Sequence, residues 1–158
     1  MDNLIVFGAK YLIILSPLIA LWVFYKASRE MRKEMIMLGT ITLPIAYVLG
    51  IIVRHFYFDP RPFVVKNITP LIAHAPDNGF PSDHMLLLAS IAAVVTYFDR
   101  KAGIVLWVIA LLVGASRVLA NVHHIIDILG SVVIALLSAW FAHAIIHKLW
   151  NRNNQTNS

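Results

Sequence analysis

The chain has 158 residues, of which 59% are hydrophobic and 13% are charged, with a formal net charge of +5. This apolar share, with a mean hydropathy of +0.76, excludes an ordinary soluble domain and predicts a protein with several membrane-spanning segments. The absence of cysteine excludes a disulfide framework and a thiolate metal site. Basic residues are dispersed among apolar runs and do not form a stripe, so we expect no nucleic-acid partner.

Five apolar runs follow one another along the chain, and a bilayer core takes roughly 20 helical residues to cross. The first run has no basic segment before it and no small-residue cleavage site after it, so we interpret it as a retained helix and not as a signal peptide. Two runs are short, and tilt or interfacial ends can make up the difference. The predicted fold is an all-α, polytopic membrane helix bundle of about five transmembrane helices, over residues 4–25, 35–56, 85–98, 102–119 and 125–146.

These runs predict a single transmembrane domain over residues 1–150, followed by a polar tail, residues 151–158, that we expect to be disordered. Cytoplasmic loops carry the excess of lysine and arginine. The side with more of them, which we expect to be cytoplasmic, carries Lys26, Arg29, Arg32, Lys33, Arg100, Lys101, Lys148 and Arg152. The opposite side carries Lys10, Arg54, Arg61, Lys66 and Arg117.

Three polar segments are predicted to converge on this second, outer face: RHFYFDPRP (54–62), PSDH (81–84) and SRVLANVHHIID (116–127). Ionisable residues at this depth are costly and mark either a functional site or a paired structural one. Arg54, Arg61 and Arg117 would supply guanidinium groups that match the oxygens of a phosphate. We expect Ser82 to cap the third helix, where backbone N–H groups favour an anion, and His84 to protonate a leaving oxygen.

One histidine and one aspartate of the last segment have the spacing of an oriented nucleophile or base. His123 and Asp127 are four residues apart on a helix and therefore share a face. His124 and Asp127 are three apart and are also neighbours, so spacing leaves the choice between the two histidines open. We expect His55, His74 and His124 to be solvated or interfacial.

With these residues in place, the chain resembles the type 2 phosphatidic acid phosphatase superfamily, whose motifs read Lys-x6-Arg-Pro, Pro-Ser-Gly-His and Ser-Arg-x5-His-x3-Asp. The corresponding residues here are Arg54 with Arg61 and Pro62, then Pro81 to His84, then Ser116 and Arg117 with His123 and Asp127. The resemblance implies a metal-independent phosphatase without a cofactor that works through a phosphohistidine. It implies His123 as nucleophile, Asp127 as its partner and His84 as general acid. It assigns the phosphoryl oxygens to Arg54, Arg61, Ser82, Arg117 and the backbone amide of Asp83.

Two residues depart from the motifs. Arg54 stands in place of lysine, which keeps the charge but exchanges a compact ammonium for a planar fork. Asp83 stands in place of glycine, and its carboxylate would repel a phosphate unless it points away or pairs with an arginine. The sequence Pro-Ser-Asp-His is similar to the bacterial undecaprenyl pyrophosphate phosphatase branch, which recycles the lipid carrier of cell-wall biogenesis.

The resulting hypothesis is an integral membrane lipid phosphatase that hydrolyses a polyprenyl (undecaprenyl) diphosphate to the monophosphate and phosphate. We expect it in a bacterial-type inner membrane, with its active site facing outside and with membrane lipids and a lipid phosphate as its partners. The alternatives are a phosphatidate or phosphatidylglycerophosphate phosphatase and a non-enzymatic membrane transporter that binds anions. Phosphate release with turnover would separate an enzyme from a transporter.

Overall fold

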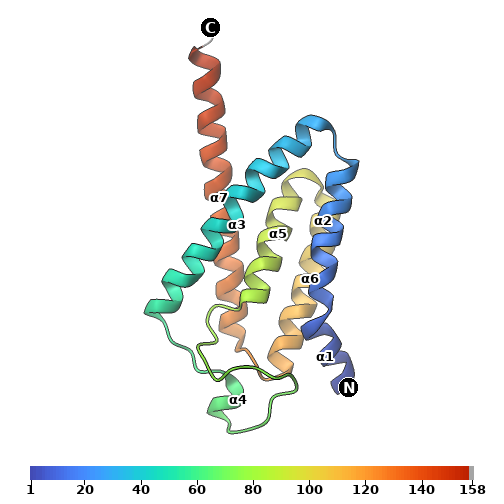
Figure 1. Cartoon of the computed structure of the whole chain (residues 1–158), viewed down its shortest axis with the longest axis vertical. Helices are drawn as coiled ribbons and strands as arrows, with labels where there is room; N and C mark the ends of the chain where they lie inside the picture. Colours follow the sequence, from blue (N-terminus) through green and yellow to red (C-terminus); the bar gives the residue numbers. More distant parts are fainter. Residues whose placement is uncertain (157–158) are drawn as a thin grey trace.

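The computed structural model describes residues 1–156, with side chains described for residues 1–148. The chain folds almost entirely into helices (Figure 1). Within residues 1–156 there is no β-strand, only an isolated bridge between Pro60 and Asn78. The predicted all-α bundle is therefore confirmed. Its elements are α1 (Asp2–Lys10), the 3-10 helix η1 (Leu12–Ile14), α2 (Leu15–Lys26), α3 (Arg29–Phe56), α4 (Pro62–Val65), α5 (Asp83–Phe98), α6 (Arg100–Leu119) and α7 (Ile125–Thr156).

Four of the five predicted crossings are long and apolar enough to span a membrane, namely Asp2–Lys26, Arg29–Phe56, Arg100–Leu119 and Ile125–Lys148. The remaining crossing, third in chain order, is α5, which has 16 residues. At 1.5 Å per residue it is about 24 Å long, shorter than a bilayer core. It contacts α2, α3, α6 and α7. Its many buried side chains, such as Leu88 and Ala92, therefore face other helices and not lipid.

The outer surface of the bundle is apolar, which is the reverse of a soluble fold. Leu21, Trp22, Leu111, Leu137 and Trp140 are each more than half exposed. A continuous exposed surface of this kind is stable only against lipid. Together with the lengths of the helices, it makes the chain a multi-pass membrane protein.

The first apolar run was predicted to be one helix, but in the structure it is interrupted by η1. The interruption has a local cause in Pro17, which has no N–H to donate to the carbonyl of Ile13 four residues earlier. The hydroxyl of Ser16 donates to that carbonyl instead, at 2.8 Å. Figure 1 shows α1 leaning away from the direction of α2.

Helix α3 runs obliquely across the bundle (Figure 1) and packs against α5 and α7. Its N-cap is Ser28, whose hydroxyl accepts the N–H of Met31 at 3.3 Å. Its far end carries Arg54 to the end of the bundle where α4 lies and where α5 and α7 begin. That end also holds the amino terminus, the loop of residues 66–82 and the turn between α6 and α7.

Four of the basic residues predicted to share one face lie at the same end of the bundle, as expected. Lys26 and Arg29 flank the α2–α3 link, and Arg100 and Lys101 begin α6, all at the end of the bundle opposite α4 (Figure 1). The polar tail expected to be disordered includes residues 157–158, which lie outside the described residues, and its disorder stays a prediction. Helix α7 extends to Thr156.

Candidate active site

The three polar segments meet at the end of the bundle where α5 and α7 begin (Figure 1). Backbone hydrogen bonds join them. The N–H of Phe63, the residue directly after the first segment, donates to the carbonyl of Asn121 at 3.1 Å, and the N–H of Ser82 donates to the carbonyl of Asp127 at 3.4 Å. Pro62 begins α4, where its missing N–H costs nothing. The first segment is thus fixed to the third, and the third to the second.

His123 lies at the centre of this junction and is buried. Its Nε2 is 3.3 Å from Nη1 of Arg61 and 3.2 Å from Nη2 of Arg117. Because guanidinium groups only donate hydrogen bonds, Nε2 must be the accepting nitrogen, and the ring proton is on Nδ1. That nitrogen donates to Oδ2 of Asp127 at 3.1 Å. Burial lowers the pKa of His123, and the positive charges of Arg117 and Arg61 lower it further, so the imidazole is neutral.

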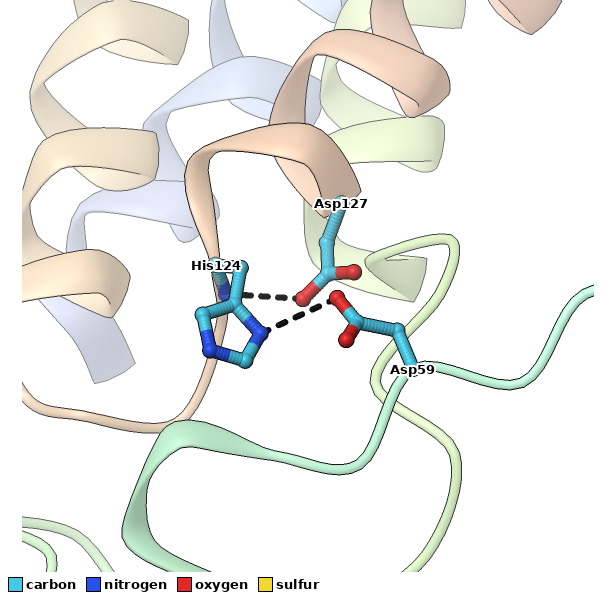
Figure 2. Close-up of side chains that lie close together, drawn as sticks. All are labelled: Asp59, His124 and Asp127. Atoms are coloured by element: carbon cyan, nitrogen blue, oxygen red, sulfur yellow. Dashed lines mark hydrogen bonds and ion pairs between the residues drawn. The ribbon is translucent and has the colours of Figure 1, made fainter. Parts of the chain in front are cut away.

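The geometry distinguishes His123 from His124, which spacing did not. The ring of His124 turns to Asp59, with Nδ1 3.0 Å from Oδ2. Only the backbone N–H of His124 contacts Asp127, at 2.8 Å from Oδ2 (Figure 2). Among the two histidines, His123 alone has its ring oriented by Asp127.

Two buried arginines surround the free nitrogen of His123. Arg61 donates to Oδ1 of Asp77 at 2.7 Å and to the carbonyl of Val122 at 2.8 Å. Burial raises the pKa of Asp77, but the hydrogen bond and charge of Arg61 outweigh it, and the pKa is lowered. Arg117 donates to the carbonyl of Ala9 at 3.3 Å, while its Nε has no partner. This concentration of positive charge around a neutral imidazole suits a phosphate group.

Ser82 occupies the N-cap position of α5, as predicted, but its side chain does not cap the helix. Its hydroxyl is fully buried and has no hydrogen-bond partner. Its carbonyl accepts the hydroxyl of Ser131 at 3.0 Å, which fixes the backbone. The expectation of a capping hydroxyl was therefore wrong, and the group is left available to an oxygen of a ligand. His84 follows in the first turn of α5 and is half-buried.

The two departures from the motif pattern, Arg54 and Asp83, pair with each other. Nη2 of Arg54 lies 2.5 Å from Oδ1 of Asp83. The same guanidinium donates to the carbonyl of Pro81 at 3.2 Å and to that of Phe80 at 3.4 Å. The ion pair gives Asp83 the neutralising arginine that a carboxylate beside a phosphate site requires.

The sequence analysis missed two residues that contact this site, Asp77 and His74. His74, expected to be solvated or interfacial, has its Nε2 3.3 Å from Nη2 of Arg117 and its ring centroid 6.1 Å from that of His123. Burial, followed by the charges of Arg61 and Arg117, lowers the pKa of His74. No sequence signal could have placed these residues, because both are in a long loop whose path depends on the helices beneath it.

Asp59 was also missed. It forms a compact cluster with Asp127 and with His124, which the sequence analysis considered only as the alternative to His123 (Figure 2). One oxygen or nitrogen from each lies within 4.8 Å of the others. Burial raises the pKa of Asp59, as does the negative charge of Asp127. A cation could enter this cluster only by displacing the hydrogen bonds that join its members, and the expectation that the protein needs no metal stays a prediction.

Comparison with known proteins agrees with the motif pattern. The model of the PAP2 superfamily matches residues 33–151, which include all three segments. The undecaprenyl-diphosphatase BcrC of Bacillus subtilis (strain 168) is 35% identical over 137 residues, covering 87% of this chain and 70% of that protein. The bacitracin transport permease protein BcrC of Bacillus licheniformis is 31% identical over 150 residues, covering 94% of this chain and 73% of that protein.

A solved structure gives an independent comparison of the fold. The crystal structure of Aquifex aeolicus LpxE superposes with a TM-score of 0.69 at 23% identity, covering 90% of this chain and 82% of that one. At this identity the likeness concerns the helix arrangement alone. The family model matches well over half of the chain, and two relatives are more than 30% identical to it. These matches confirm what the motifs indicated: the chain belongs to the PAP2 superfamily.

Proposed function

We propose that this chain hydrolyses a polyprenyl diphosphate to the monophosphate and phosphate through a phosphohistidine at His123. The proposal refines what family membership already gives, a membrane phosphatase. The observation that carries it is the environment of His123, whose Nε2 faces Arg61 and Arg117 while Nδ1 is held by Asp127. A neutral imidazole with its lone pair between two phosphate-binding groups is placed to attack phosphorus.

In the first step, the lone pair of Nε2 on His123 forms a bond to the terminal phosphorus. The bond from that phosphorus to the bridging oxygen breaks, and its electrons leave with the lipid monophosphate. His84, in the protonated form, donates a proton to the departing oxygen. Arg61 and Arg117 neutralise the charge on the remaining oxygens, and Asp127 stabilises the imidazole ring as it becomes cationic.

In the second step, water attacks the phosphohistidine. His84, now neutral, accepts a proton from this water, the P–N bond breaks and its electron pair returns to Nε2 of His123. Phosphate leaves and the starting protonation states are restored. Both steps use the same arginines, because the charge develops on the same oxygens.

Two further groups support the grip on phosphate. The hydroxyl of Ser82 is buried without a partner, so an oxygen of the substrate would satisfy it. The backbone N–H of Asp83 belongs to the first turn of α5, where helix N–H groups favour an anion. Arg54 joins them only if its contact with Asp83 loosens or is shared with the substrate.

The substrate class and the orientation of the protein rest on the position of the site. It lies at one end of the helix bundle, where the headgroup of a lipid would reach it while the tail stays in the bilayer. One relative is named an undecaprenyl-diphosphatase. The basic residues at the opposite end favour a cytoplasmic location for that end, and so an outward-facing site in a bacterial inner membrane.

The test is phosphate release from undecaprenyl diphosphate by the purified chain in detergent with EDTA. His123→Ala should abolish release. His143→Ala, which removes a histidine stacked on Tyr97 near the end of α5 that is remote from the site, should leave it unchanged. Denaturation in alkaline detergent during turnover should trap phosphate that is stable to alkali and labile to acid on the wild-type chain, and none on His123→Ala. Full activity of His123→Ala would exclude this nucleophile.

Two alternatives are decided by the same preparation. Faster release from phosphatidate or phosphatidylglycerophosphate than from undecaprenyl diphosphate would replace the proposed substrate but keep the site. The second alternative, an anion transporter, has some support because one relative is named a bacitracin transport permease. Multiple turnovers by protein in detergent, where no compartments exist, would exclude a purely transporting role.

A further inference from the structure

Asp59 and His124 form a second carboxylate–histidine pair directly beside that of His123 and Asp127 (Figure 2). Oδ2 of Asp59 lies 3.0 Å from Nδ1 of His124, and the two side chains are 15% and 37% exposed. Neither residue occupies a fixed position of the three motifs, and the chemistry proposed above uses neither. Their role therefore needs a separate account.

His124 connects the two carboxylates. Its ring contacts Asp59, and its backbone N–H donates to Oδ2 of Asp127 at 2.8 Å. The same oxygen accepts Nδ1–H of His123 at 3.1 Å. A single oxygen of Asp127 thus takes one hydrogen bond from the proposed nucleophile and one from the residue that Asp59 holds.

The other oxygen of Asp127, Oδ1, is buried and has no partner. Apart from its bond to His123 itself, the carboxylate is therefore oriented by the backbone N–H of His124. A carboxylate can orient an imidazole only if something else fixes the carboxylate. That requirement makes the position of His124 important for the geometry of His123.

Asp59 is itself held firmly. Its N–H donates to the side-chain oxygen of Asn78 at 3.0 Å, and its carbonyl accepts the N–H of Gly79 at 2.8 Å. The packing is close, because a Cβ on Gly79 would lie 3.0 Å from Oδ2 of Asp127 and 3.2 Å from the carbonyl oxygen of Asp59. Asp59 can therefore hold His124 against a rigid segment.

We propose that Asp59 is a positioning residue for phosphoryl transfer, fixing His124, which fixes Asp127 and thereby the ring of His123. The inference rests on the proposed function. Asp59 also adds a negative charge to a cluster whose atoms lie within 4.8 Å of one another. That charge favours the cationic ring that His123 acquires when it is phosphorylated.

The experiment compares Asp59→Ala, which removes both contact and charge, with Asp59→Asn, which keeps an oxygen that can accept from His124. Asp99→Asn, at the start of α6 at the opposite end of the bundle, is the matched control. We expect Asp59→Ala to lower kcat about tenfold, as for other outer partners of a functional histidine, with KM within about twofold. Asp59→Asn should recover part of the loss.

A merely structural role would lower the thermal unfolding midpoint and change KM together with kcat. If Asp59→Ala does not fold, Asp59→Asn carries the comparison. The proposal would be overturned if Asp59→Asn has the kcat of wild type and Asp59→Ala either has that kcat too or does not fold.

A second readout does not depend on turnover. Nitrogen NMR of histidine side chains in detergent reports the hydrogen bond of each Nδ1. Asp59→Asn should move the signals of both His124 and His123, and an unchanged His123 signal would overturn the proposal even if wild type hydrolyses no lipid tested. Wild-type inactivity with a shifted His123 signal would instead count against the proposed function alone.

Discussion

Replacing Asp83 with asparagine should tighten binding of a phosphate substrate, because it releases Arg54 from an ion pair. The two side chains are 36% and 67% exposed and their charged atoms are 2.5 Å apart. Water screens such a pair, so its coupling free energy is about 1 kcal/mol at most, equivalent to about a fivefold change in a binding constant. We expect Asp83→Asn to lower KM by up to about fivefold, with little change in kcat.

The assay is a double-mutant cycle on phosphate release, with Asp83→Asn, Arg54→Gln and the double variant. Removing a negative charge near an anion site favours binding even without Arg54, so the single substitution is not decisive. The decisive quantity is the difference between the effect of Asp83→Asn with Arg54 present and its effect with Arg54 replaced. If the two effects are equal, or if Asp83→Asn raises KM, the ion pair does not restrain Arg54.

Two further predictions concern stability, each measured as a thermal unfolding midpoint in detergent. Gly103→Ala should destabilise the protein by about 1–3 kcal/mol, because the added Cβ would lie 2.3 Å from Oγ1 and 2.7 Å from Cα of Thr96. The control Gly39→Ala should be tolerated, because a Cβ there meets nothing within 4 Å. Equal midpoints for the two variants would contradict this packing. The pKa of His74 is lowered from 6.5, so the stability it contributes is complete above about pH 6.5 and is lost as the pH falls below it. The midpoint of wild type should therefore fall more than that of His74→Gln between about pH 7.5 and 5.5, and parallel falls would refute the assignment.

The long helices were predictable because their apolar runs have clear boundaries. Ser28 and Asp99 each precede a run and accept N–H groups of its first turn. The break at η1 was not predicted, although Pro17 was visible, because a proline near the start of a helix is usually tolerated. Its effect depended on Ser16 offering an alternative donor to the carbonyl of Ile13.

Within the site, the residues with fixed spacing were predictable and their partners were not. The His123–Asp127 contact was predicted from helical spacing, and the contact is present at 3.1 Å. His123, however, lies before α7, which begins at Ile125, so the two residues do not share a helical face. The contact of Arg54 with Asp83 joins α3 to α5, and that of Asp59 with His124 joins residues 65 positions apart. Side chains from separate segments meet only after the helices pack, and nothing in the local sequence determines which of several charged groups each will find.

Arg61 and Arg117 are 4% and 2% exposed, and of the described carboxylates only Asp77, on the rim, forms an ion pair with either. Two buried positive charges that share a single carboxylate are costly to the fold. Inorganic phosphate, which the reaction would release, carries the oxygens that these groups lack. We therefore expect phosphate to raise the unfolding temperature and to compete with the lipid, so that departure of the product limits turnover as its concentration rises.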